Sequence, residues 1–145
     1  MAWKQPKTDW EGKSDSEGKY TGDYFNAEDY NRIKGNIEIL RDLAWDLYLR
    51  FGMQDMGSDK KVGDYLYADE INAMEENLDA ICRNTIPDLA GKKKNYYENT
   101  AMIDFAELNR IESCCLELYK NLMNQRDGGR YQLAFTLGTG RLRWD

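Results

Sequence analysis

Apolar residues recur along three stretches of the chain at alternating spacings of three and four residues. The first stripe is Tyr30, Ile33, Ile37, Leu40, Ala44 and Leu47, the second is Ile71, Met74, Leu78 and Ile81, and the third is Leu108, Ile111, Cys115, Leu118 and Leu122. This spacing puts each stripe on one face of a helix, as a narrow coiled-coil-like seam. The sequence therefore predicts a mainly α protein of three related helices. Their packed stripes should bury Ile33, Ile37, Leu40, Met74, Leu78, Ile111, Cys115 and Leu118.

The three stretches also begin alike, as "YFNAEDYNRI" from Tyr24, "YLYADEINAM" from Tyr65 and "MIDFAELNRI" from Met102. Asn26 and Asp104 are favourable N-cap residues, whereas Tyr67 at the same place is a poor one. An acid stands three residues after each cap, where it favours the positive end of the helix. Apolar residues before and four after each cap form a hydrophobic staple, and we expect contact in at least two of the three pairs: Phe25 with Tyr30, Leu66 with Ile71, and Ile103 with Leu108.

The helix ends are less sharply marked. The first helix should reach Phe51, with Gly52 as its stop, and its Ile39, Leu43 and Trp45 predict a second covered face. The second should end before Pro87, because the residue preceding a proline disfavours helical geometry. The third should end near Asn124, before two consecutive glycines. The connections "GMQDMGSDKKVGD" and "IPDLAGKKKNYYEN" are long for a helical bundle and could hold short structure of their own.

Both ends of the chain depart from the helical pattern. Residues 1–24 combine glycines with aromatic side chains and predict an extended arm ahead of a three-helix repeat domain at 25–126. In the tail, 127–145, apolar residues alternate with polar or small ones from Tyr131 to Leu137, and "GTG" follows. Alternation with period two predicts a strand, so the tail is expected to form a short β-hairpin whose return strand ends at Trp144.

The arm and the tail are the candidate contact surface. A two-stranded hairpin is marginal alone, and strand addition to another chain would use its backbone groups and alternate side chains together. We therefore expect an interface with another subunit or protein that is lined by Trp3, Trp10, Tyr131, Phe135 and Trp144. The alternative is that arm and tail pair with each other and cover the protein's own core.

Polar residues also recur at fixed places in the repeat. Asn31, Asn72 and Asn109 each follow the stapled position, where they could bind a ligand or could bond the backbone of a neighbouring segment and fix the packing register. Arg32 and Arg110 come next, with Ala73 in the second copy. These arginines are expected to form exposed pairs with acids of adjacent helices, each contributing under about 1 kcal/mol.

Composition excludes several classes of protein. The net charge is −6 and the sequence pI is about 4.8, which argues against nucleic acid as the main partner. No apolar run is long enough to span a membrane, and the N-terminus lacks the apolar core of a signal peptide, so we expect folding in a cytoplasm. The three cysteines, Cys82, Cys114 and Cys115, suit buried thiols better than a disulfide framework.

Catalysis has little support in the sequence. The chain has no histidine, which excludes Ser-His or Cys-His activation of a nucleophile. Neighbouring carboxylates such as Glu75 and Glu76 are consecutive on a helix and point different ways. The adjacent Cys114 and Cys115 are expected to be core thiols, with a redox or metal role as the alternative. We therefore expect no enzyme and no cofactor.

Several segments together carry a family resemblance: "PKTDW" in the arm, "YFNAEDYNRI" at the first helix start and "LAFTLG" at Leu133 to Gly138. In these segments the chain resembles small virion proteins from the tail modules of phages and prophages of Gram-positive, largely clostridial, bacteria. The resemblance implies a structural component of a tail, baseplate or fibre, assembled in the bacterial host cytoplasm, with other virion proteins as partners. A homo-oligomer is compatible with it.

Two other functions stay open at this point. One is a host-surface binding module that recognises a receptor or glycan through exposed aromatic residues, which would need a concave aromatic site. The other is a small cytoplasmic protein that binds and regulates a bacterial host protein. An adaptor within a particle would instead show oligomers or symmetry-matched docking.

Overall fold

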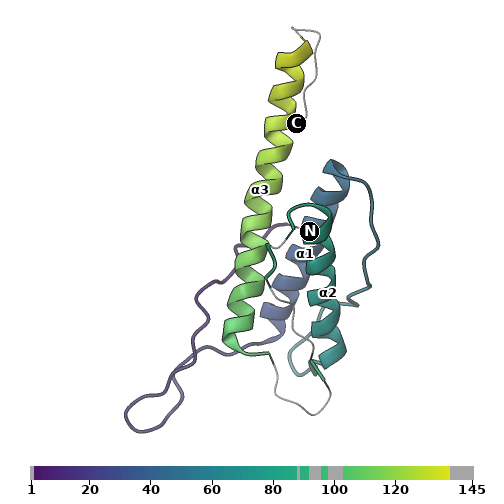
Figure 1. Ribbon diagram of the computed structural model, residues 1–145. Helices are drawn as coiled ribbons and strands as arrows, with labels where there is room; N and C mark the ends of the chain where they lie inside the picture. The colour runs from purple at the N-terminus through teal and green to yellow at the C-terminus, as the bar shows by residue number, and fades with distance from the viewer. Residues whose placement is uncertain (1, 88, 92–95, 98–102, 138–145) are drawn as a thin grey trace.

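The computed structural model describes residues 2–87, 89–91, 96–97 and 103–137, with side chains as far as Gly128. It contains three helices, α1 (Ala27–Leu47), α2 (Ala68–Asn84) and α3 (Phe105–Leu137). Figure 1 shows that all three run in the same direction, so their first turns lie together at one end of the molecule. A parallel arrangement requires the chain to return to that end between successive helices. Extended segments make these two returns, before α2 and before α3, and another extended segment precedes α1.

We call these extended segments the first strap (residues 2–26), the second strap (48–67) and the third strap (85–104, described apart from the gaps above). In their described parts the straps lead back toward the helix starts, and each is hydrogen-bonded to two helices. The predicted extended arm is thus the first of three equivalent straps. The long connections that could have held short structure are the other two, and their described residues contain neither helix nor strand.

Local hydrogen bonds explain where the helices begin. Asn26 Oδ1 accepts from Asp29 N at 3.2 Å, and Asp29 Oδ2 accepts from Asn26 N at 3.1 Å, which completes a capping box. Asp104 Oδ1 likewise accepts from Glu107 N at 2.8 Å. At α2 the side chain of Tyr67 makes no cap hydrogen bond, as expected, and the start depends on Tyr67 N donating to Glu70 Oε1 at 3.0 Å.

The three apolar stripes meet in one core, which confirms the shared seam. Ile37, Leu40, Met74, Ile81, Leu118 and Leu122 have no exposed surface. Each of the other residues predicted to be buried is at most 1% exposed. The second face of α1 is also covered, because Leu43 is buried and Ile39 packs against the core.

The ends of α1 and α2 show how tertiary packing sets a boundary. α1 stops at Leu47, four residues before the predicted Phe51, because Tyr48 turns to an extended conformation. The chain then places the Phe51 ring edge-on to Trp45, with 6.2 Å between ring centroids. α2 ends at Asn84, before Pro87 as predicted, and Thr85 Oγ1 donates to Ile81 O at 2.7 Å across its last turn.

The predicted C-terminal hairpin is wrong in the part that the structure describes. α3 continues through Gly128 to Leu137, so Tyr131 and Phe135 lie on a helix and its predicted end near Asn124 is also wrong. The reason is that the helix satisfies its own backbone groups, whereas a strand at this place has no partner strand among the described residues. The turn at 138–140 and Trp144 lie outside the described residues. α3 projects well past the ends of α1 and α2 (Figure 1).

Candidate functional site

An asparagine clamp holds one strap to each helix. In each clamp the Asn side chain accepts from the N–H and donates to the C=O of a single strap residue. One side-chain amide thus satisfies both backbone groups of that residue, as a neighbouring strand would in a sheet. The pairs are Asn31 with Lys60 (2.7 and 2.8 Å), Asn72 with Tyr96 (2.7 and 2.7 Å) and Asn109 with Trp10 (2.8 and 3.0 Å). The prediction that these residues bond the backbone of a neighbouring segment is confirmed.

A second clamp stands five residues further along two of the helices. Asn36 bonds both backbone groups of Lys4, and Asn77 bonds both backbone groups of Gln54. Each strap therefore crosses from the middle of the helix that follows it in the sequence to the start of a different helix. The first strap joins α1 to α3 and the second joins α2 to α1, while the third reaches α2 from α3. The three helix-and-strap units repeat one set of contacts in cyclic order, which gives the fold an approximate threefold axis.

Buried ion pairs fill two of the three helix interfaces. Glu112 is 1% exposed and accepts from Arg32 Nε at 3.0 Å, from Arg32 Nη2 at 2.8 Å, from Lys7 N at 3.0 Å and from the indole N–H of Trp10. Glu75, 3% exposed, accepts from Arg110 Nη2. The arginines pair with acids of neighbouring helices as predicted, but the expectation of exposed pairs is wrong, because each carboxylate is enclosed between a strap and two helices.

The third interface carries a matched pair of substitutions. Ala73 on α2 stands where the other copies have Arg32 and Arg110, and Lys34 on α1 stands where they have Glu112 and Glu75. Lys34 Nζ bonds Asp59 of the second strap at 2.7 Å and Glu38 at 3.2 Å. Without an arginine at position 73, an acid at position 34 would be a buried carboxylate with no partner, which would be strongly destabilising. Lys34 in place of the acid avoids this.

The pKa shifts follow from this enclosure. Burial alone would lower the pKa of the Arg32 guanidinium, but hydrogen bonds to Glu112 and Asp29 outweigh it and raise the pKa. The pKa of Arg110 is raised in the same way by Glu75 and Glu107. Burial raises the pKa of Tyr30 to about 12, and Glu70 and Asp59 add to the effect. The positive charges of Arg32 and Arg110 are thus fixed at neutral pH and serve to position the helices.

The straps and helix starts leave a hollow near the threefold axis, at the end where the helices begin. Its volume is about 270 Å³, and one staple residue from each unit lines it: Phe25, Leu66 and Ile103. These three residues are partly buried and pack against the core, and their predicted partners Tyr30, Ile71 and Leu108 are each 1% exposed. Tyr30 also lines the hollow, together with Asn26, Ala27, Lys60 and Asp64. The three staples therefore give one site an apolar wall.

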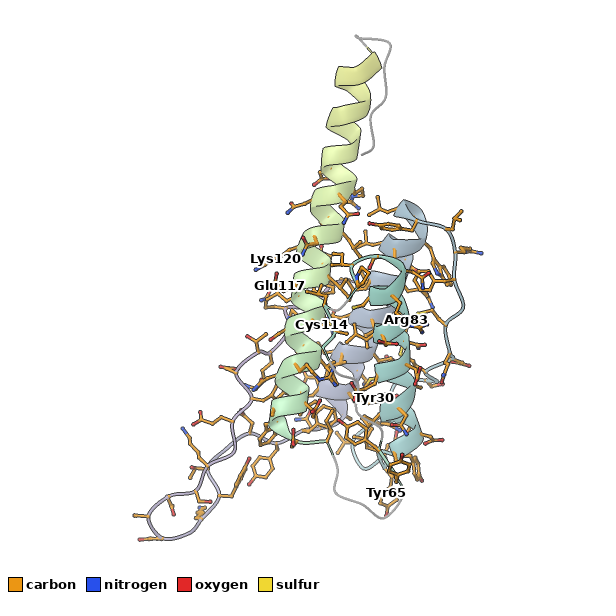
Figure 2. The ribbon with its side chains drawn as sticks, in the orientation of Figure 1. Tyr30, Tyr65, Arg83, Cys114, Glu117 and Lys120 are labelled. Carbon is orange, nitrogen blue, oxygen red and sulfur yellow. The ribbon has the colours of Figure 1, made fainter. Side chains whose placement is uncertain are left out.

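Four exposed tyrosines stand at the same end of the molecule, in or beside the helix starts. Tyr24 and Tyr65, seven residues before Asn31 and Asn72, are 71% and 76% exposed, and Tyr67 and Tyr97 are 59% and 67% exposed. Figure 2 shows Tyr65 at this end of the bundle, below Tyr30. The exposed acids Glu28, Asp64, Asp69 and Asp104 stand in the same helix starts and turns. We call this surface, with its hollow, tyrosines and exposed acids, the helix-start face.

The polar groups of the hollow already have partners within the chain. Lys60 Nζ bonds Glu70 Oε2 at 2.7 Å, Tyr30 OH donates to Met56 O at 3.2 Å, and Asn26 caps α1. Among the residues that the structure describes, no group of three acidic or cysteine side chains is placed to hold a metal ion. No helix in the described part of the chain is long and apolar enough to cross a membrane. The arrangement offers shape, aromatic surface and negative charge for recognition.

Two of the predicted interface residues, Trp3 and Trp10, have described side chains, and both pack against the chain's own residues. Trp10 is 5% exposed and packs between Phe25 and Phe105, with ring centroids 5.8 and 5.6 Å away, so it belongs to the chain's own core. Trp3 stacks on Tyr119 of α3 at 4.0 Å. The described part of the arm thus covers the chain's own core, whereas the pairing of arm and tail that the alternative also requires stays a prediction. The structure gives no side-chain positions for Tyr131 and Phe135, and Trp144 lies outside the described residues.

Sequence reasoning missed the buried acids and the exposed tyrosines. A comparison of the three repeats could have found the acids. The position three residues after the clamp asparagine is Lys34, Glu75 and Glu112 in the three repeats, and the lysine replaces the acid at the same interface at which Ala73 replaces the arginine. The tyrosines carry no such signal, since the sequence does not tell an exposed Tyr65 from a buried Tyr30. No protein-family model, curated protein or solved structure matches this chain.

Proposed function

We propose that this chain is a non-enzymatic structural protein that docks onto other protein chains through its helix-start face. The observation that carries the proposal is the hollow of about 270 Å³ that Phe25, Leu66 and Ile103 line, with exposed tyrosines at the same end of the molecule. Tyrosine is enriched at protein interfaces because its ring supplies a large contact area and its hydroxyl a hydrogen bond. An apolar hollow on the same face as such tyrosines is a suitable receptor for one anchoring side chain of a partner.

The charge of the face defines the partner. Glu28, Asp64, Asp69 and Asp104 are exposed there, whereas the nearby Lys60 is already paired with Glu70. An apolar or aromatic side chain flanked by Lys or Arg would fill the hollow and oppose these acids. Complementary charge of this kind mainly raises the association rate and excludes wrong partners. The partner is therefore a segment of another chain with a protruding apolar residue in a basic context.

The particle that we propose is a phage tail, baseplate or fibre, or a related tail-like particle, assembled in the bacterial cytoplasm. The resemblance in the "PKTDW", "YFNAEDYNRI" and "LAFTLG" segments supports this assignment. The cyclic repetition of the fold adds to it, because a single chain with approximate threefold symmetry can seat on a symmetric axis of a larger assembly. The partners are then other virion proteins.

The test uses the products of the genes that flank this one as probes. Each is co-expressed with the full chain, and any complex is measured by size-exclusion chromatography with light scattering and by calorimetry. We expect one flanking product to bind, and Tyr65→Ala and Asp69→Lys each to weaken that binding at least about tenfold, which is about 1.4 kcal/mol.

Matched controls come from surfaces away from the helix-start face. Leu49, which is 91% exposed just after α1, and Glu117, an exposed acid of α3, supply Leu49→Ala and Glu117→Lys. These variants should bind like the unchanged protein. Binding that falls equally in controls and test variants, or no complex with any flanking product, would overturn the proposal.

The exposed tyrosines also favour a second candidate, recognition of a host-surface glycan, because sugar rings stack on aromatic faces. Tyr65 and Tyr67, with 6.4 Å between ring centroids, would supply the platform. Calorimetric titration with polysaccharide from the host cell wall separates the two functions. Saturable binding that Tyr65→Ala abolishes and Asp69→Lys leaves intact would favour the glycan, since a neutral sugar does not respond to that charge.

A further inference from the structure

Two cysteines from different helices meet in the core. Cys82 lies near the end of α2 and Cys114 in the third turn of α3, and their Sγ atoms are 3.7 Å apart. Both are nearly enclosed, with 1% and 4% of their surfaces exposed. All three cysteines are free thiols, and Figure 2 shows Cys114 at mid-height in the bundle.

The threefold repetition shows that this pair replaces an asparagine clamp. Cys114 stands five residues after Asn109, where α1 has Asn36 and α2 has Asn77. Those two asparagines bond both backbone groups of Lys4 and Gln54, and the equivalent strap residue here is Ala90. Ala90 is held differently: its C=O accepts from Arg110 Nη1 at 2.8 Å, and its backbone also hydrogen-bonds Cys82. The third strap is thus fastened over a pair of thiols.

We propose that Cys82 and Cys114 form a site of reversible oxidation, at which a peroxide or a small-molecule disulfide links α2 to α3 through a disulfide bond. A disulfide needs its sulfurs about 2.05 Å apart, so small side-chain movements of two residues already in contact suffice. Cys115, one residue further on, points to a different side of α3 and lies in the shared seam, where it is 1% exposed.

The environment assigns the roles of the two sulfurs. Hydrogen bonds from the Cys114 thiol and the Ala90 backbone lower the pKa of Cys82. The pKa of Cys114 is raised by its bond to Cys82 and by burial. The Cys82 thiolate therefore attacks the oxidant. With hydrogen peroxide, sulfur takes one oxygen to give a sulfenic acid and hydroxide leaves. Cys114 sulfur then attacks Cys82 sulfur and expels a second hydroxide, and the two thiol protons convert both hydroxides to water.

With a small-molecule disulfide, the same two positions react by exchange. The Cys82 thiolate attacks one sulfur of the reagent, and one small thiolate leaves. Cys114 then displaces the second small thiol from the mixed disulfide. The product closes the chain between residues 82 and 114, and so encloses the whole third strap. Such a link stabilises a protein mainly by restricting its unfolded chain.

The experiment incubates the full, reduced protein under native conditions with hydrogen peroxide and, separately, with oxidised glutathione. Remaining thiols are alkylated, and the protein is digested with trypsin, which cuts after Lys61, Arg83, Arg110 and Lys120. We expect a linked pair of peptides, residues 62–83 with residues 111–120, and a melting temperature several degrees above that of the reduced protein. Dithiothreitol should reverse both changes.

Three variants make the result specific. Cys115→Ala should form the same linked peptides, which also shows that Cys114 is the bonded residue of the adjacent pair. Cys82→Ala and Cys114→Asn should form no link and gain no stability from the oxidant, and Cys114→Asn restores the residue of the other two units. Free thiols at both positions after oxidation of the folded protein, or a disulfide that uses Cys115 or joins two chains, would overturn the proposal.

Discussion

The side-chain amide of Asn109 on α3 bonds both the N–H and the C=O of Trp10, at 2.8 and 3.0 Å, across 99 positions of sequence. This contact attaches the N-terminal strap to the last helix and completes the cycle of three clamps. Because it closes a long loop of the chain, the packing of the bundle has to offset the entropic cost of this contact. It makes the first strap part of the fold, although its sequence looks like that of a free arm.

Asn109→Ala should lower the free energy of unfolding by about 2–3 kcal/mol, because two hydrogen bonds are lost and the backbone N–H of the buried Trp10 loses its partner. Urea unfolding followed by circular dichroism measures the change. The matched control is Asn121→Ala, whose amide bonds Glu117 O within its own exposed helix turn. That control should change stability by a few tenths of a kcal/mol, and equal losses in the two variants would contradict the clamp.

Ile37→Ala should cost about 2–5 kcal/mol, because truncation leaves a cavity at a fully buried position in the seam. The same denaturant titration gives the value. Leu49→Ala removes apolar atoms of a residue that is 91% exposed and should change stability by less than about 0.5 kcal/mol. A loss of only a few tenths at Ile37 would mean that the three stripes do not share one core.

Glu112→Lys should destabilise the protein by about 3–5 kcal/mol, because it leaves Arg32 facing a buried like charge. Adding Arg32→Ala recreates at this interface the pair found at the third one, Ala73 with Lys34. The double variant should recover about 1–3 kcal/mol relative to Glu112→Lys alone, and a double-mutant cycle by urea unfolding measures this coupling. Additive losses would show that the substitutions at the third interface are unrelated.

Stability should fall as the pH rises from about 10 to about 12, in part through Tyr30. Burial raises the folded-state pKa of Tyr30 from its ordinary value of 10.0 to about 12, so the folded protein holds this proton more tightly than the unfolded chain. Its contribution is complete below the unfolded pKa and is lost as the pH passes through the folded one. Thermal melts across this range should show a shallower fall for Tyr30→Phe, even though this variant also loses the hydrogen bond to Met56.

Tyr65→Phe is the control for the alkaline prediction, since its ring is 76% exposed. Its melting temperature should follow that of the unchanged protein at every pH. If Tyr30→Phe has the same slope as this control, Tyr30 does not link stability to pH.

The sequence by itself determined the three helices and the seam between them. The spacing of residues such as Ile33, Ile37 and Leu40 permits one helical face, and burying that face drives the packing whatever the rest of the chain does. Capping residues such as Asn26 and Asp104 act within one turn, so the helix starts could be predicted as well. The repeated asparagines could be assigned to backbone bonding, because a polar group beside a seam needs a partner.

Only the tertiary structure decided which backbone those asparagines bond, how the straps are ordered and where the helix-start face lies. A clamp binds a backbone N–H and C=O, and every residue except proline carries both groups. The residue types of Lys60, Tyr96 and Trp10 therefore do not identify them as the partners. The end of α1 and the tail were missed for a related reason. Alternating apolar residues from 131 to 137 suit a strand only if another strand pairs with it, and without one among the described residues the helix continues. The local sequence pattern shows which side chains a segment can bury, whereas long-range contacts decide which other segments pack against them.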